Sequence, residues 1–230
     1  MAETQGAVGL ALTRVRHDGQ VNPPAPEWQV VVLTGGGSRR MGRDKATLGV
    51  GGASLLDRTL AGVPAEVPVV VAGPRVSMDR AGVRFVQEDP LGGGPVAGLE
   101  AALTLVSTPV VVVLATDLPL IGTLPELLAA DLAGDDGADP PLDGVLADDA
   151  SGRPQQLCAA YRTSALRRAI AETGPANGAA MRDVVSKLRT STVSVSAVSG
   201  TTEVDPTWDI DTPDDVQRLT ELLAETRPDP

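Results

Sequence analysis

The sequence has few of the side chains that ligate metals through sulfur or imidazole. Its 230 residues contain one cysteine, Cys158, and one histidine, His17. These counts exclude an internal disulfide framework and a cysteine-cluster metal site, and histidine-based catalysis is not expected. No apolar run approaches the ~20 residues that cross a bilayer. The N-terminus also lacks a charged segment followed by an apolar one. We therefore expect a cytoplasmic protein with no membrane association.

Aromatic residues are also scarce, at 2% of a chain that is 42% hydrophobic. The core must then come from Val, Leu, Ile and Ala, which suits buried parallel strands better than an aromatic-rich sandwich. Basic residues are outnumbered, since 19 against 30 acidic residues give a formal charge of −11. This balance argues against nucleic acid as a partner. Lys45 and Lys187 are the two lysines of the chain.

Short apolar runs alternate with helical patterns from Val30 onward. Strands are expected at residues 30–33, 67–72, 83–86, 110–115, 145–147, 157–161 and 192–198, and helices around 55–60, 96–106, 124–132, 164–173, 179–188 and from 212. One apolar helix face is expected to comprise Leu124, Leu127, Leu128 and Leu132, and residues 212–215 are expected to form a capping box at the start of the last helix. The alternation predicts a three-layer α/β/α fold with a mostly parallel, doubly wound sheet. We expect a single domain over residues 29–225, preceded by a partly disordered extension over residues 1–28. Its residues 22–26 include three prolines and cannot continue a helix or a central strand.

An aspartate-rich stretch lies between residues 131 and 149. It holds seven aspartates and no basic residue, with glycines and two consecutive prolines between them. Most of it is expected to form an exposed acidic loop. A metal-binding loop is the alternative, although the spacing of the carboxylates fits no EF-hand pattern.

The densest functional signal follows the first expected strand. Residues 33–45 read Leu-Thr-Gly-Gly-Gly-Ser-Arg-Arg-Met-Gly-Arg-Asp-Lys. Glycines let backbone N–H groups converge on a ligand, and the basic side chains supply positive charge beside it. The segment is not a Walker A loop, because Lys45 comes two residues late and Ala46 replaces the Ser or Thr. Nor is it a dinucleotide fingerprint, because Arg40 stands at the third glycine position. It predicts a polyphosphate site at the carboxyl edge of the sheet, with a glycine-rich turn as the alternative.

A second candidate is Asp117, which follows the most apolar strand of the chain and precedes Pro119. A carboxylate at the end of a central parallel strand lies on the same sheet edge as the glycine-rich segment. Mg²⁺ takes one or two carboxylates together with substrate phosphates. Asp117 is therefore predicted to be a Mg²⁺ ligand, and an aspartate that caps the following helix is the alternative.

Residues 33–45 resemble the L-x-G-G-x-S-x-R-M-G-x-D-K signature of the molybdenum-cofactor nucleotidyltransferases and match every fixed position. Segments 87–99, 115–119, 156–161 and 209–216 resemble further elements of that family in the same order, so the resemblance spans about residues 29–223. It implies a Rossmann-like fold of the nucleotide-diphospho-sugar transferase type. It also implies transfer of GMP from GTP to molybdopterin, with Mg²⁺ as cofactor and pyrophosphate as leaving group.

Two other functions stay open beside this one. One is a CTP-dependent cytidylyltransferase that acts on the same pterin, and the other is a non-catalytic nucleotide-binding protein in cofactor delivery. Gly35 favours GTP, because the absent Cβ leaves room for a purine. The Asp209-x-Asp211 form is more typical of the cytidylyl branch. The resemblance also suggests molybdoenzymes or their chaperones as protein partners.

The resemblance assigns roles to individual residues. Arg40, Lys45 and Asp117 would be catalytic, the first two by stabilising the triphosphate and the departing pyrophosphate. The residues expected to contact the nucleotide are Leu33, Thr34, Gly35, Gly36, Lys45, Asp89, Gly94, Gly98 and Asp117. Asp89 is equally consistent with a turn before Pro90. Asp209 and Asp211 would lie near the second substrate, or would be ordinary acidic residues at the N-terminus of a helix.

Overall fold

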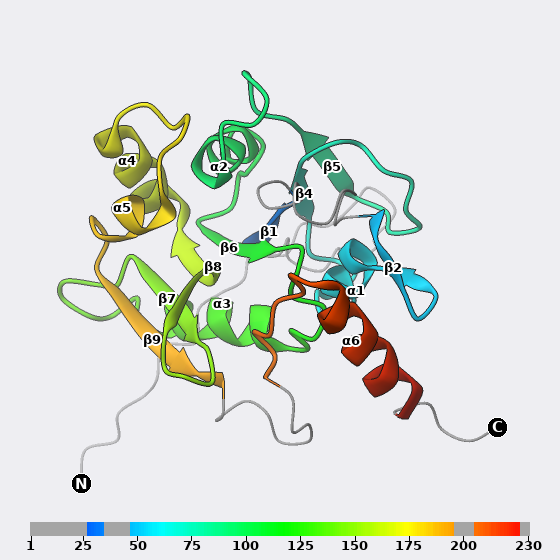
Figure 1. Ribbon diagram of the computed structural model, residues 1–230. Helices are drawn as coiled ribbons and strands as arrows, with labels where there is room; N and C mark the ends of the chain where they lie inside the picture. The colour runs from blue at the N-terminus through cyan, green and yellow to red at the C-terminus, as the bar shows by residue number, and fades with distance from the viewer. Residues whose placement is uncertain (1–26, 35–46, 196–204, 226–230) are drawn as a thin grey trace, which may run out of the picture.

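The computed structural model describes residues 27–34, 47–195 and 205–225, and its main element is a seven-stranded sheet between two layers of helices (Figure 1). The strands are β1 (Trp28–Leu33), β2 (Gly49–Val50), β3 (Ala53–Ser54), β4 (Val69–Ala72), β5 (Val83–Val86), β6 (Val110–Ala115), β7 (Gly144–Asp148), β8 (Pro154–Arg162) and β9 (Thr190–Ser194). The helices are α1 (Leu55–Ala61), α2 (Pro95–Leu103), α3 (Leu124–Gly134), α4 (Thr163–Thr173), α5 (Met181–Val185) and α6 (Pro213–Glu225). Strands β2 and β3 form a separate antiparallel pair.

The order of the strands in the large sheet is β5-β4-β1-β6-β8-β7-β9. Strands β5, β4, β1 and β6 are parallel, β8 is antiparallel to both of its neighbours, and β9 pairs in parallel with β7. The mostly parallel, doubly wound sheet is thus confirmed. From β1 the chain passes to β4 on one side and later returns through α2 to β6 on the other. The carboxyl ends of β1 and β6 therefore flank the point where the strand order reverses, which is where open α/β sheets bind ligands.

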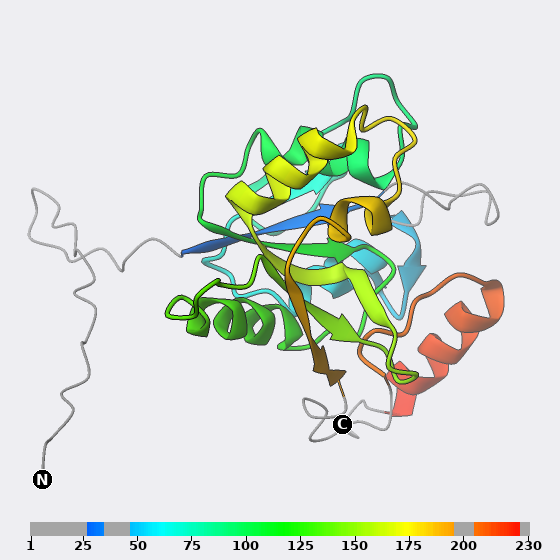
Figure 2. The same cartoon turned by 90° about the vertical axis from the view of Figure 1, so that its left-hand side faces the viewer.

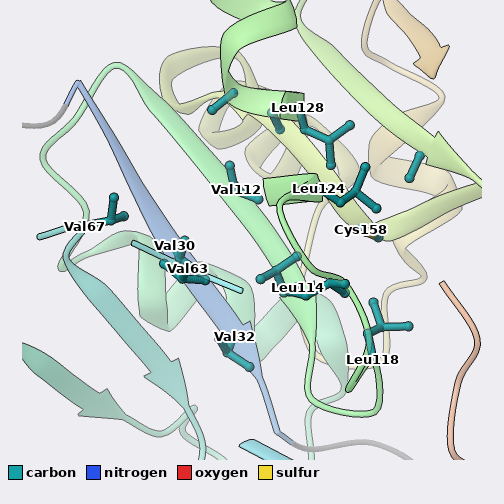
Figure 3. Packing of buried hydrophobic residues seen from close by; sticks show 14 of the residues in the cluster. Val30, Val32, Val63, Val67, Val112, Leu114, Leu118, Leu124, Leu128 and Cys158 are labelled. Atoms are coloured by element: carbon teal, nitrogen blue, oxygen red, sulfur yellow. The ribbon is translucent and has the colours of Figure 1, made fainter. Parts of the chain in front are cut away.

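The central strands are apolar at successive positions because helices cover both faces of the sheet. In β1, Val30 and Val32 face the layer that contains α1 and α3, whereas Val31 and Leu33 face the layer of α2, α4 and α5 (Figure 2). Figure 3 shows Val112 and Leu114 of β6 beside Leu124 and Leu128 of α3 in the first of these layers. The aliphatic core expected from the composition is therefore present on both faces.

Several expected boundaries were wrong. Helix α2 ends at Leu103, and the residues that follow form i→i−3 turns that lead to the Gln29 side chain, which accepts a hydrogen bond from the Ser107 N–H at 2.7 Å. The helix expected over 179–188 is reduced to the short α5. Leu127 is 43% exposed rather than part of the buried face of α3.

The loop within the aspartate-rich stretch 131–149 is shorter than expected. Helix α3 continues to Gly134 and β7 begins at Gly144, so that the loop covers only residues 135–143. Two of its aspartates contact residues at neighbouring strands: Asp136 forms an ion pair with Arg162 at 2.7 Å, and Asp143 accepts a hydrogen bond from the Arg189 N–H at 3.0 Å. The carboxylates therefore tie this loop to β8 and to the start of β9.

Cys158 lies on β8 with none of its surface exposed. Burial raises the pKa of its thiol to about 12, with a smaller contribution from the charge of Asp205. The residue is thus a small apolar core residue. Along the described part of the chain, no helix has the length and apolarity to span a membrane.

Candidate functional site

The carboxyl ends of β1, β4 and β6 meet at one edge of the sheet. Leu33 pairs with Ala72 of β4 on one side and with Ala115 of β6 on the other. Thr34 follows β1, and Thr116 and Asp117 follow β6, so the structure brings the predicted residues Leu33, Thr34 and Asp117 to this edge. The predicted Gly35, Gly36, Arg40 and Lys45 lie outside the described residues, in a segment that starts directly after Thr34.

The N-terminus of α2 lies at the same edge. Gly94 caps this helix with a φ of 88°, a conformation that favours glycine, and Pro95 occupies the first helical position. A Cβ at Gly98 would lie 3.6 Å from the Cβ of Ala72 and 3.8 Å from a methyl carbon of Leu33. These are ordinary contacts, so packing does not require a glycine here. Gly98 is buried beside the ends of β1 and β4, and its assignment to the nucleotide stays a prediction.

Glu88, which was not among the residues predicted from the sequence, lies beside Gly98 at this edge. Its Oε1 accepts a hydrogen bond from the Gly92 N–H at 3.0 Å, and its Oε2 lies 3.9 Å from the position of a Cβ at Gly98. The predicted Asp89 is exposed to solvent. Glu88 stands two residues past the end of β5, as Asp117 stands two residues past the end of β6. That shared offset was the signal that could have identified it.

Asp117 is half-buried in the wall of a cavity of about 370 Å³. Its backbone carbonyl accepts a hydrogen bond from the Ile210 N–H at 3.0 Å. The residue does not cap the following helix, because α3 begins at Leu124 with Thr123 as its N-cap. The cavity is lined by Ala115, Asp117, Leu118, Arg153, Pro154, Gln155, Gln156, Leu157 and Asp209. The structure thus brings Asp209 to the same cavity as Asp117.

Ile210 explains how Asp209 reaches this position. Its side chain is fully buried in a small core with Val50, Leu55 and Leu219. This burial fixes the segment that precedes α6 beside the carboxyl end of β6. Asp209 is exposed towards the cavity, whereas Asp211 is exposed at the start of α6 and is not among the described residues that line the cavity. The two aspartates, predicted as a pair, therefore have different surroundings.

The N-terminus of α6 is organised by a capping box. The Thr212 hydroxyl accepts from the Asp215 N–H at 3.2 Å, and the Asp215 carboxylate accepts from the Thr212 and Asp211 N–H groups at 2.8 and 3.1 Å. Partial burial opposes ionisation of Asp215, but these hydrogen bonds outweigh it and hold its pKa below the ordinary value. The capping box expected from residues 212–215 is confirmed.

A second cavity, of about 570 Å³, adjoins the first and shares Arg153, Gln155 and Asp209 with it. Trp208 and Arg218 line its wall, with the guanidinium 5.1 Å from the centre of the indole ring. The cavity therefore offers an aromatic surface and two guanidinium groups close to the carboxyl end of β6.

Two carboxylates of this second cavity, Asp149 and Asp205, accept hydrogen bonds from the surrounding loops. Asp149 accepts hydrogen bonds from the Ser151 hydroxyl and the Arg153 N–H at 2.6 and 3.0 Å, and these bonds lower its pKa. Asp205 accepts from the N–H groups of Ala150 and Thr207, both at 2.8 Å. Both carboxylates thus stabilise the backbone of the loops around the cavity.

A larger hollow, of about 970 Å³, lies elsewhere, between α1, the segment 119–123 and α6. Its described lining includes none of the predicted site residues. Size alone therefore does not identify the functional site, and the chemistry points to the edge at Asp117.

The carboxylates at this edge suit a metal that substrate helps to bind. Across residues 27–34, 47–195 and 205–225, no cluster of three or more His, Cys, Asp or Glu side chains could hold a metal ion. Asp117 and Asp209 on one cavity wall provide the one or two carboxylates that Mg²⁺ uses when phosphates complete its coordination. The donor set therefore fits a divalent cation that arrives with a nucleotide.

Comparison with known proteins identifies the family. The model of the MobA-like NTP transferase domain matches residues 30–193. The chain belongs to the MobA-like NTP transferase family. A probable molybdenum cofactor guanylyltransferase of Pelotomaculum thermopropionicum is 30% identical over 201 residues, which cover 86% of this chain and 94% of that protein. Another, from Haloferax mediterranei, is 28% identical, with 82% and 91% of the two chains covered. As a member of this family, the chain is a nucleotidyltransferase.

Solved structures share the fold at lower identity. The molybdopterin-guanine dinucleotide biosynthesis protein A of Archaeoglobus fulgidus has a TM-score of 0.68 and 23% identity, with 86% of this chain and all of that chain covered. The 2-C-methyl-D-erythritol 4-phosphate cytidylyltransferase of Thermus thermophilus has a TM-score of 0.59 and 19% identity, with 84% and 98% covered. The same fold thus occurs in proteins named for guanine and for cytidylyl transfer, so the fold alone does not decide the base.

Proposed function

We propose that this MobA-like transferase moves GMP from GTP to molybdopterin, which forms the guanine dinucleotide cofactor and releases pyrophosphate. The observation that carries the proposal is the position of Asp117 between two regions. On one side lie the ends of β1 and β4 with Gly98 and Glu88, and on the other lies the cavity that contains Asp209. The first region suits the nucleotide and the second suits the acceptor. The names of the relatives support the same reaction.

In the proposed reaction, a phosphate oxygen of the pterin attacks the α-phosphorus of GTP. A new P–O bond forms, the bond from the α-phosphorus to the α–β bridging oxygen breaks, and pyrophosphate leaves with the electron pair. The attacking phosphate is already anionic, so no general base is needed. Positioning and charge neutralisation supply most of the rate in such transfers. Lys45 and Arg40 would neutralise the triphosphate, and Mg²⁺ held by Asp117 would neutralise charge on the α-phosphoryl oxygens.

The second cavity is the proposed site of the pterin. Arg153 lines both cavities, so its guanidinium is available to an acceptor phosphate that approaches Asp117. Trp208 offers a flat aromatic surface to a planar ring, with Arg218 stacked beside it. Asp209 lies where the two cavities meet, which supports its assignment to the second substrate. Asp211 would act indirectly, because its N–H bonds Asp215 at the start of α6.

Several finer features belong to the same proposal. The metal would be Mg²⁺, because the available ligands are carboxylates and phosphates. Residues 29–225 would form one catalytic unit, since β1 and α6 both contribute to the site edge. Cytoplasmic location, and transfer of the product to molybdoenzymes or their chaperones, rest on the family resemblance.

Direct turnover measurements test the proposal. The full chain is incubated with molybdopterin, Mg²⁺ and either GTP or CTP, and both pyrophosphate and dinucleotide are quantified. We expect kcat/KM for GTP to exceed that for CTP by roughly 10–200-fold, the range typical of steric discrimination. A ratio of one or below would assign the chain to cytidylyl transfer. Nucleotide binding without any pyrophosphate release would instead support a non-catalytic delivery protein.

Replacing Gly35 with alanine is expected to reduce the ratio of kcat/KM values for GTP and CTP by roughly 10-fold or more. A methyl group at this position would displace a purine and still admit a pyrimidine. Steady-state kinetics with both nucleotides provide the measurement. A ratio that stays at the wild-type value would remove Gly35 from base selection.

Glu88 and Asp89 form a matched pair for testing the nucleotide side. Glu88→Gln keeps the shape of the side chain but removes its charge, and we expect kcat/KM for GTP to fall roughly 10–100-fold, the usual effect of losing a charge-assisted hydrogen bond. Asp89→Asn should change kcat/KM by less than about threefold, because Asp89 is exposed. The opposite ranking of the two variants would restore Asp89 as the nucleotide contact.

A further inference from the structure

Three buried threonine hydroxyls connect elements near the edge of the sheet where the carboxyl ends of β1, β4 and β6 meet. Thr59, Thr116 and Thr34 are 0%, 3% and 7% exposed. The Thr34 hydroxyl donates to the Ala72 carbonyl at 3.0 Å, and the Thr116 hydroxyl donates to the Leu33 carbonyl at 2.8 Å. The Thr59 hydroxyl, on α1, lies 3.0 Å from the Thr116 carbonyl. Together these contacts link α1 to β6, β6 to β1, and β1 to β4.

Two of these hydroxyls, those of Thr34 and Thr116, are not needed to satisfy the carbonyls that they contact. The Thr34 N–H already donates to Ala72 at 3.1 Å, and the Thr116 N–H already donates to Leu33 at 3.2 Å. A valine would fill the same buried space without the cost of removing a hydroxyl from water. Each hydroxyl therefore adds a second attachment one residue beyond the strand end, where the regular pairing of the sheet stops.

The neighbouring strand is shaped around one of these contacts. A Cβ at Gly73, directly after β4, would lie 1.7 Å from the Thr34 Oγ1. Gly73 also continues the pairing of the strands, because its N–H donates to Val86 at 2.8 Å. The end of β4 therefore accommodates the Thr34 side chain only because residue 73 is glycine.

The residues that follow these threonines are the ones that carry the chemistry. Gly35 comes directly after Thr34, and Asp117 comes directly after Thr116. We propose that Thr34 and Thr116 are positioning residues, whose hydroxyls hold the ends of β4, β1 and β6 together and so fix the position of Asp117 at this edge. An error of about 1 Å in such an alignment can cost on the order of 10²-fold in rate. The inference rests on the proposed function insofar as Asp117 takes part in GMP transfer.

Thr116→Val tests the inference with little change in shape. We expect kcat to fall roughly 10–100-fold while KM for GTP changes much less, because alignment rather than binding is lost. The dissociation constant of Mn²⁺ in the presence of a non-hydrolysable GTP analogue, measured by calorimetry, should rise by about 10-fold. The melting temperature should fall by only roughly 2–4 °C. Thr116→Ser, which retains the hydroxyl, should restore kcat to near the wild-type value.

Thr163 provides a matched control. It is also a buried threonine, at the opposite end of β6, and among the described residues its hydroxyl has no hydrogen-bond partner. Its N–H donates to the Pro109 carbonyl at 2.8 Å, far from the carboxyl edge along the strand. Thr163→Val should therefore leave kcat and Mn²⁺ binding unchanged.

Amide hydrogen exchange in the nucleotide-free protein gives a readout that does not depend on activity. Thr116→Val should raise the exchange rate of the Thr116 and Thr34 amides several-fold, whereas Thr163→Val should not. If the wild-type protein fails to transfer GMP but this exchange pattern holds, the proposed function fails and the threonine linkage stands. If Thr116→Val matches the wild type in kcat and exchange, the linkage is refuted. Thr34→Val, measured in the same way, decides the question if Thr116→Val does not fold.

Discussion

Asp117→Ala is expected to reduce GMP transfer by roughly 10²–10³-fold or more and to remove metal-dependent GTP binding. The carboxylate stands at the carboxyl end of β6, in the wall of a cavity that it shares with Asp209. The fold should persist, because the bond between the Ile210 N–H and Asp117 uses the backbone carbonyl, which alanine retains. Pyrophosphate release, Mn²⁺-dependent GTP binding and the melting temperature are the three measurements.

Asp131→Ala is the control for this variant, because Asp131 is an exposed carboxylate on α3, away from the sheet edge. It should have wild-type activity and stability. If Asp117→Ala melted at a much lower temperature and kept its activity, Asp117 would be a structural residue and the metal assignment would fail.

Lys45→Ala is expected to lower turnover on the order of 10²-fold or more in a protein that stays folded. The side chain would supply a positive charge to the triphosphate, and alanine leaves that charge without compensation in the transition state. Single-turnover pyrophosphate release separates this effect on chemistry from an effect on product release.

Lys187 offers an unusually close control, because it is the other lysine of the chain and is exposed after α5. Lys187→Ala changes the net charge by the same amount at a surface position. It should have wild-type kinetics. Near-normal turnover in Lys45→Ala would show that the glycine-rich segment does not hold the phosphates through this lysine.

In the proposed reaction, the two-sided arrangement at Asp117 would let one carboxylate serve two substrates. The ends of β1 and β4, with Gly98 and Glu88, form one side, and the joined cavities of Arg153 and Trp208 form the other. The strand order reverses between β1 and β6, and this reversal opens the crevice in which both sides meet. The strand order of the sheet therefore sets the position of Asp117 relative to both sides.

Local patterns in the sequence were sufficient for the features that depend on neighbouring residues. Continuous apolar runs predicted β1, β4 and β6, because a strand covered on both faces has no polar side. The residues 212–215 predicted the capping box of α6, since its hydrogen bonds join residues within one turn. The glycine-rich segment and its basic residues predicted a phosphate site from composition and order alone, and that prediction still awaits a test.

Features that depend on contacts between distant residues required the tertiary structure. Asp209 lines the same cavity as Asp117 because Ile210 is buried beside α1 and β2, whereas the sequence around Asp209 equally suited a helix N-terminus. Glu88 rather than Asp89 lies beside Gly98, and the path of the backbone after the end of β5 determines which of the two does so. The partner of each threonine hydroxyl depends on which strand lies next to it. Strand order and register set these neighbours, and they are decided by the packing of the whole sheet rather than by any local run of residues.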